Sequence, residues 1–225
     1  METLKEGVSL RYYMFHKPAG CVTARTDPLL PTVMDFLPVK QRRGLHAIGR
    51  LDRDTTGLLL LTDDGALTFR LTRPEFSFQK RYFFRAFGTV SEADQKRLAE
   101  GGALYGNGSL AKPAFFSDLK AETIAENAAF LPDKKRERAL RNPGGAVTTG
   151  VITVTEGKRH EVKLLLRSCG CSVFSLKRLS IGEITLDEAL APGEFRPLNE
   201  TEMAFVERCR SLYIENIGKM QEKNH

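Results

Sequence analysis

Asp52 stands out because arginines lie close to it on both sides in the sequence, at Arg50 and Arg53. The three residues belong to a stretch bounded by Gly49 and Gly57. Positive charge near a carboxyl group favours the ionised form and lowers its pKa. A carboxylate held ionised in this way can act as a nucleophile. Charge and glycine content alone fit a surface turn with a salt bridge better, so the nucleophile hypothesis needs further support.

A second enzyme class uses a similar pattern. Residues 52–56, DRDTT, match the D-x-D-x-T motif of haloacid-dehalogenase-type phosphatases, in which the first aspartate attacks phosphorus and Mg²⁺ neutralises charge. That fold requires a continuous apolar strand before the motif, and residues 48–51 (IGRL) interrupt such a strand. It also requires a late acidic pair to hold the metal, for which the sequence offers no good candidate. The sequence therefore disfavours a phosphatase.

Local patterns predict the elements that must position this stretch. Residues 58–62 form an apolar run too short for a typical helix, so we predict a buried strand directly after Asp52. Further strands are predicted at residues 10–15, 80–87, 150–155 and 173–186, the last as a strand pair. Helices are predicted at residues 66–72, 91–100, 160–169 and 200–214. Strands and helices mix without a regular βαβ rhythm, which favours an α+β fold.

Composition and charge narrow the class of protein. The chain has 225 residues, of which 41% are hydrophobic and 28% charged, close to the globular average, so a disordered chain is excluded. Its net charge of +6 favours polyanionic partners, nucleic acid first. The longest apolar run, residues 58–61, is far shorter than the roughly 20 residues of a membrane span. The N-terminus carries acids and no apolar core, so we expect a cytoplasmic protein without a signal peptide.

The cysteines and histidines do not suggest a metal site. Two of the four cysteines are close in sequence, Cys169 and Cys171, but C-x-C is tighter than the C-x-x-C pairs of most zinc sites. The four histidines form no H-x-x-x-H pair. We therefore expect reduced, structural thiols and no metal.

The stretch around Asp52 also resembles a known family. Residues 49–65, GRLDRDTTGLLLLTDDG, are similar to the central motif of the pseudouridine synthases of the RsuA type, which act on ribosomal RNA. Four other segments resemble further family elements: residues 12–20 (YYMFHKPAG, with His16 where asparagine is usual), 80–82 (KRY), 156–163 (EGKRHEVK) and 176–182 (LKRLSIG). Together they cover most of residues 10–198, and the combination is specific.

The resemblance implies a fold, a reaction and roles for named residues. The expected catalytic fold has a mixed, mostly antiparallel central sheet with flanking helices and a central cleft. Uridine in RNA would become pseudouridine, an isomerisation that needs no cofactor. Asp52 matches the essential aspartate, which acts by attack on C1′ or through a glycal intermediate. Tyr82 matches the tyrosine that stacks on the target base. Lys163 matches the basic partner of the aspartate.

Two positions depart from the family pattern. Lys163 stands where arginine is usual, and lysine cannot form a bidentate fork with a carboxylate, although a single charged hydrogen bond is still available to it. Glu161 stands where glutamine is usual and adds an acid at that junction. Leu166 follows on the same predicted helix and could form an apolar wall under the base, which ordinary core packing explains nearly as well.

The reaction requires the target uridine to leave its stack, because a nucleotide inside a stem cannot reach Asp52. Basic residues on the rim of a cleft can offset the cost of this base flipping through phosphate contacts. The candidates are Lys17, Arg50, Arg53, Lys80, Arg159, Lys177 and Arg178. We expect RNA as the partner, ribosomal RNA first and transfer RNA second, and a monomer.

The resemblance also suggests an organisation for the chain. We expect an N-terminal tail at residues 1–9, one catalytic domain at 10–215 and a C-terminal tail at 216–225. The small RNA-binding domain that many family members carry first would then be absent. An irregular basic excursion at residues 118–147, which holds Arg136 and Arg138, could contribute to substrate choice. The non-enzymatic alternative is an RNA-binding or ribosome-assembly protein.

Overall fold

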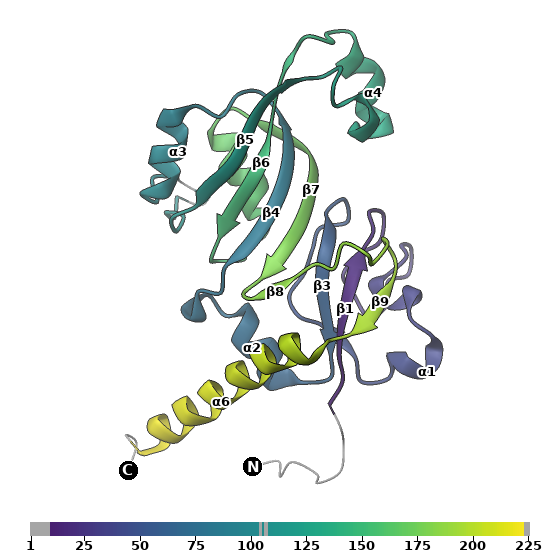
Figure 1. Ribbon diagram of the computed structural model, residues 1–225, viewed down its shortest axis with the longest axis vertical. Helices are drawn as coiled ribbons and strands as arrows, with labels where there is room; N and C mark the ends of the chain where they lie inside the picture. Colours follow the sequence, from purple (N-terminus) through teal and green to yellow (C-terminus); the bar gives the residue numbers. More distant parts are fainter. Residues whose placement is uncertain (1–9, 104, 106–107, 223–225) are drawn as a thin grey trace.

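One mixed β-sheet runs the length of the molecule, and the helices lie around it (Figure 1). The computed structural model describes residues 10–103, 105 and 108–222, with side chains as far as residue 211. Residues 1–9, the predicted N-terminal tail, lie outside the described residues. The strands in this part of the chain are β1 (Tyr12–Lys17), β2 (His46–Ala47), β3 (Thr56–Thr62), β4 (Lys80–Phe87), β5 (Phe115–Thr123), β6 (Ala146–Val154), β7 (Ser172–Ile181), β8 (Ile184–Thr185) and β9 (Phe195–Pro197).

The sheet joins two lobes at a parallel contact. Its strand order is β5-β6-β4-β7-β3-β1-β9, with β2 beside β3 and β8 beside β7. The contact between β3 and β7 is parallel, and the other pairings are antiparallel. Strands β4 to β7 form the upper lobe in Figure 1, and β1, β3 and β9 form the lower one. The predicted α+β class with a mostly antiparallel sheet is confirmed.

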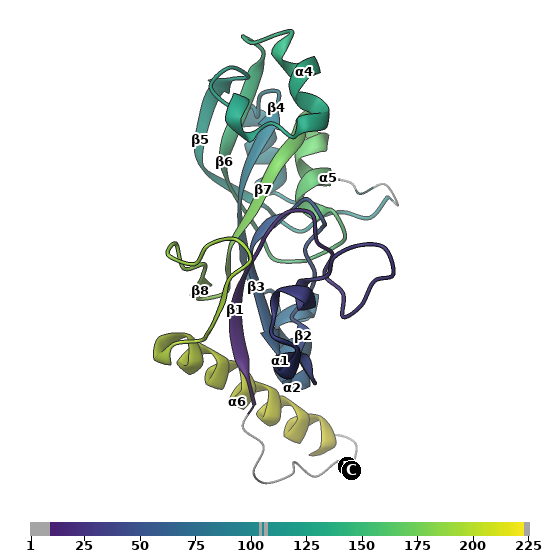
Figure 2. The ribbon, with the colours of Figure 1, turned by 90° about the vertical axis from the view of Figure 1, so that its right-hand side faces the viewer.

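Helices cover the sheet unevenly. They are α1 (Val39–Arg42), α2 (Gly65–Thr72), α3 (Glu92–Ala99), α4 (Asp133–Leu140), α5 (Glu161–Ser168) and α6 (Glu200–Glu222), with short 3-10 turns η1 (Val33–Phe36), η2 (Pro74–Phe76) and η3 (Ala128–Phe130). Figure 2 shows the sheet nearly edge-on, with α1 and α5 on one side and β8 on the other. The face that carries α5 is the one that bears the site described below.

The leucine run of β3 is explained by burial on both faces. Leu59 and Leu61 pack into one core cluster with Phe15, whereas Leu58 and Leu60 face a second cluster. Side chains alternate between the faces of a strand, so a strand covered on both sides needs apolar residues at every position. The second cluster includes α2 and the first turns of α6, which pack against each other.

A glycine allows β3 and β7 to approach closely. Gly57 has φ +101° and pairs with Arg178 of β7. A Cβ atom added at Gly57 would clash with the backbone carbonyl oxygen and nitrogen of Arg178. The glycine at the end of the Asp52 stretch is therefore required by both conformation and space. The side chain of Arg178 is buried, and its Nε donates to the carbonyl oxygen of Leu58 at 2.7 Å.

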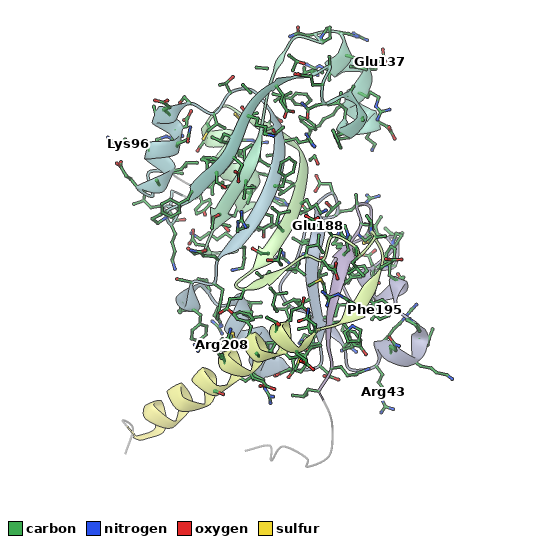
Figure 3. All side chains as sticks on the ribbon, viewed as in Figure 1. Arg43, Lys96, Glu137, Glu188, Phe195 and Arg208 are labelled. Carbon is green, nitrogen blue, oxygen red and sulfur yellow. The ribbon has the colours of Figure 1, made fainter. Side chains whose placement is uncertain are left out.

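Two predicted segments differ from the structure. Residues 118–147 are not irregular: they complete β5, form η3 and α4, and begin β6. Figure 3 shows Glu137 of α4 at the far end of the upper lobe. The C-terminal helix continues to Glu222, so residues 216–222, predicted as a tail, belong to α6. Residues 133–140 (DKKRERAL) are charged at six of eight positions, and Gly218 interrupts the last turns of α6, so both segments look like exposed loop or tail in the sequence.

Candidate active site

A buried lysine holds the loop that carries Asp52. Lys17 is fully buried, and its Nζ donates to the carbonyl oxygens of Pro18 at 3.0 Å, Arg53 at 3.3 Å and Thr55 at 3.0 Å. The loop is pinned further by the Gly20 amide, which donates to the carbonyl of Arg53 at 2.8 Å. Burial lowers the pKa of Lys17. Lys17 therefore supports the loop from below, and its prediction as a phosphate-binding residue on the rim is wrong.

Asp52 forms an ion pair with Lys163, as expected. Its Oδ2 lies 2.9 Å from the Lys163 Nζ, and its Oδ1 lies 3.4 Å from the His160 Nε2. The side chains of Asp52 and Lys163 are 27% and 26% exposed, so this pair is only partly screened by water. The flanking arginines do not supply the charge that we expected. Arg53 donates to the carbonyl of Gly20 instead, and within the described residues no ion pair joins Asp52 to Arg50 or Arg53.

The N-terminal end of α5 places Lys163 opposite the loop. His160 precedes the helix in the left-handed conformation, with φ +57°, and this turns the chain into α5. The buried Glu161 stabilises the turn, because its Oε2 accepts a hydrogen bond of 2.8 Å from the Gly157 amide. Burial raises the pKa of Glu161. Burial disfavours the charge of Lys163, but hydrogen bonds with Asp54 and Asp52 outweigh it and raise its pKa.

A cavity of about 830 Å³ opens beside the ion pair. This volume lies within the range of pockets that bind small ligands, so it can hold a single extruded nucleotide. Tyr82 of β4 lies in its wall with only 9% of its surface exposed. Eight of the predicted site residues line the cavity: Arg50, Asp52, Arg53, Lys80, Tyr82, Arg159, Lys163 and Arg178.

Leu166 and Lys177 do not line this cavity. Leu166 is completely buried in the main core cluster, so it packs the interior of α5 and does not form an exposed wall. Lys177 lies between Leu176 and Arg178, which both line the cavity, and alternate residues of a strand point to opposite faces. Its side chain therefore belongs to the other face of the sheet. Both predictions as cavity residues are wrong for the same reason: the direction of a side chain depends on register and packing.

The basic residues of the cavity fall into two groups. Arg50, Arg53 and Arg159 are exposed on the rim, where they can meet phosphate groups. Lys80 and Arg178 are buried in the wall. The Nζ of Lys80 donates to the carbonyls of Phe78 and Glu156, and burial, with a smaller contribution from Arg178, lowers its pKa to about 8. The two groups can serve different purposes, one in polyanion binding and one in shaping the wall.

The structure adds two residues to which the sequence assigned no role in the site. Asp54 places Oδ1 2.6 Å from the Lys163 Nζ, although its side chain is 74% exposed. Burial disfavours ionisation of Asp54, but the hydrogen bond and charge of Lys163 outweigh it and lower its pKa. His160 faces Asp52, as described above. Both residues lie inside the motifs of residues 49–65 and 156–163, but only the folded loop shows that they converge on Lys163 and Asp52.

The remaining observations concern metals and membranes. Among the described residues no group of three or more histidine, cysteine, aspartate and glutamate side chains is arranged to hold a metal ion. All four cysteines are free thiols. No helix in the described part of the chain combines the length and apolar composition needed to cross a bilayer.

Comparison with known proteins places these features in a family. Residues 11–168 match the family described as RNA pseudouridylate synthase. The chain is 37% identical over 203 residues to ribosomal small subunit pseudouridine synthase A of Yersinia pestis, covering 90% of this chain and 75% of that protein. It is 38% identical over 196 residues to the protein of the same name from Escherichia coli, covering 87% and 74%.

Solved structures agree with the sequence comparison. A crystal structure of a pseudouridylate synthase superimposes with a TM-score of 0.71 at 34% identity, covering 89% of this chain and 74% of that one. Human RNA Pseudouridylate Synthase Domain Containing 1, at 15% identity and a TM-score of 0.52, shares the fold over 93% of this chain and 98% of its own. From the site, the matched family and these relatives, we conclude that this chain belongs to the RNA pseudouridylate synthase family and is an isomerase that converts uridine to pseudouridine in RNA.

Proposed function

We propose that this protein converts a specific uridine of ribosomal RNA to pseudouridine, with Asp52 as the catalytic carboxylate. One observation carries the assignment of Asp52: its carboxylate pairs with Lys163 at 2.9 Å on the wall of a nucleotide-sized cavity that Tyr82 also lines. The names of the similar bacterial enzymes favour small-subunit ribosomal RNA as the substrate, with transfer RNA as the second candidate.

The chemistry requires a nucleophilic or charge-stabilising group beside C1′ of the ribose. The bond from C1′ to N1 breaks, the uracil turns within the cavity, and a bond from C1′ to C5 forms. The hydrogen leaves C5 and N1 gains one, so the reaction balances as an isomerisation without a cofactor. In this proposal Asp52 attacks C1′ or stabilises the route through a glycal. Tyr82 packs on the uracil ring, and Lys163 keeps Asp52 ionised and oriented.

RNA reaches the cavity through its basic rim. Phosphates on either side of the flipped nucleotide would meet Arg50, Arg53 and Arg159, offsetting the few kcal/mol of unstacking. Helix α4 offers a second positive surface far from the cavity. Its cations are exposed at Lys134, Lys135, Arg136 and Arg138, and Arg141 follows directly. We propose that this surface binds RNA that flanks the target, in a monomer that acts in the cytoplasm.

The test is site-specific conversion by the purified protein. Unmodified transcripts of small-subunit ribosomal RNA, with uridine tritiated at C5, are incubated with the protein, and released tritium is counted. Chemical mapping then locates any pseudouridine. We expect stoichiometric release at one uridine, and little release from transfer RNA transcripts. Tight RNA binding without tritium release would favour a non-catalytic role in ribosome assembly. Conversion only in transfer RNA would overturn the proposed substrate.

A further inference from the structure

Lys163 is shared between two carboxylates. Its Nζ lies 2.6 Å from the Asp54 Oδ1 and 2.9 Å from the Asp52 Oδ2. The shorter contact is therefore to the residue that has no assigned role. Asp54 is also by far the more exposed acid, at 74% against 27% for Asp52. A residue so exposed gains little stability from an ion pair, so stability alone does not explain this arrangement.

The backbone of the loop brings both acids to the same ammonium group. The Thr55 amide donates to the carbonyl of Asp52 at 3.1 Å, which closes a tight turn between the two side chains. Lys17, buried below, holds the carbonyls of Arg53 and Thr55. Because the turn is tied down on both sides of Asp54, its carboxylate has a defined position relative to α5.

The chemistry of lysine makes a second anchor useful. An arginine presents a planar fork that engages both oxygens of one carboxylate and so sets its own direction. An ammonium group is a point charge on a flexible stem with no such preference. Paired with Asp52 alone, the Nζ could approach either oxygen. Held also by Asp54, it remains at Oδ2, and among the described residues Oδ1 has one ion-pair contact, the longer one of 3.4 Å with His160.

We infer that Asp54 is a positioning residue: it holds the Lys163 ammonium on the Oδ2 side of Asp52 and leaves Oδ1 available for the reaction. The inference rests on the proposed function, because it takes Asp52 as the reacting carboxylate. It assigns Asp54 no contact with the substrate. Asp54 is needed because residue 163 is a lysine. The need should disappear in Lys163→Arg, because a guanidinium fork sets its own direction on a carboxylate.

The experiment is a double-mutant cycle of Asp54→Asn and Lys163→Arg, with single-turnover rates at saturating RNA. We expect Asp54→Asn to lower the rate about three- to fivefold with Lys163 in place, the upper part of the range for loss of a largely exposed ion pair. In the Lys163→Arg background, Asp54→Asn should lower the single-turnover rate by less than about twofold, because the guanidinium fork orients itself on Asp52. Equal losses in both backgrounds, or no loss in either, would overturn the inference.

A matched control separates positioning from simple charge. Glu183 is exposed, does not line the cavity, and forms an ion pair with Arg208. Glu183→Gln removes a carboxylate charge from an exposed ion pair, as Asp54→Asn does, and keeps an oxygen acceptor. Its rate should equal that of the unchanged protein. If Glu183→Gln slows turnover as much as Asp54→Asn, the effect does not depend on the contact with Lys163 and the inference fails.

A second measurement does not depend on turnover. The Lys163 ammonium can be titrated by NMR of its side chain, and loss of the Asp54 carboxylate should lower its pKa relative to the unchanged protein. Glu183→Gln should leave the pKa of Lys163 unchanged. An unchanged Lys163 pKa in Asp54→Asn would show that the contact is not maintained in solution and would overturn the inference. Absence of any uridine conversion by the unchanged protein would instead count against the proposed function.

Discussion

Replacement of Lys163 by methionine removes the ammonium group from Asp52 and keeps an apolar side chain of similar length. A hydrogen bond to a charged group contributes about 1.5–3 kcal/mol. The side chains of Asp52 and Lys163 are each about a quarter exposed, so water can replace part of this hydrogen bond. We therefore use about 2 kcal/mol as its free-energy contribution. If the contact is stronger by this amount in the transition state than in the bound ground state, its loss lowers turnover about 30-fold. The free energy of unfolding should change by less than about 1 kcal/mol, since both acids reach water.

The assay is single-turnover tritium release at saturating RNA, with RNA affinity measured separately. Lys163→Arg is the control that keeps the charge and should retain most of the rate. Affinity of Lys163→Met for RNA should fall only slightly, because one positive charge is lost near the rim. A full rate in Lys163→Met would refute the reasoning. So would a defect that saturating RNA removes, because the lysine would then act in binding only.

Three further changes test other parts of the structure. Gly57→Ala should destabilise the fold by about 2–4 kcal/mol in denaturant unfolding, because of its φ of +101° and its contact with Arg178, whereas Gly65→Ala, which meets no atom within 4 Å, should not. Lys80 loses its proton at about pH 8 in the folded state and at its ordinary pKa of 10.5 when unfolded, so it contributes a rise of roughly 3 kcal/mol to the free energy of unfolding between these pH values. The unchanged protein should gain about that much stability relative to Lys80→Met over this range, and a constant difference between the two proteins would contradict it. Arg136→Gln with Arg138→Gln should reduce the salt dependence of RNA binding by about 0.7–0.9 per lost phosphate contact without changing the saturated rate, in contrast to Lys96→Gln on α3.

Elements with strong local signals could be predicted from the sequence. Strand β4 has the predicted bounds, Lys80–Phe87, because the segment is rich in aromatic residues, which favour strands. Helix α3, predicted at residues 91–100, begins after Ser91, a residue type that often caps helices, and the Ser91 Oγ accepts a hydrogen bond from the Asp94 amide. These features depend on residues a few positions apart, which a linear pattern records.

The geometry of the site depends on distant contacts that no local pattern contains. Lys163 and Asp54 are 109 positions apart, and the parallel pairing of β3 with β7 brings the two halves of the site together. The motif resemblance identified Asp52 and Lys163 as partners, but it could not show that Asp54 lies even closer to that lysine. It also could not separate the supporting Lys17 from the exposed Arg159, because burial is set by the whole fold.

The central claim is that the Asp52 carboxylate performs the chemistry, and Asp52→Asn tests it most directly. The amide keeps the shape of the side chain and removes its charge and nucleophilicity. Lys163 keeps Asp54 as a partner, so the change leaves no unpaired buried charge and the fold should be maintained. The measurement is tritium release from ribosomal RNA together with RNA affinity. We predict no detectable turnover, with affinity unchanged or slightly tighter because a negative charge has left a basic cleft. Full turnover by Asp52→Asn would contradict the account.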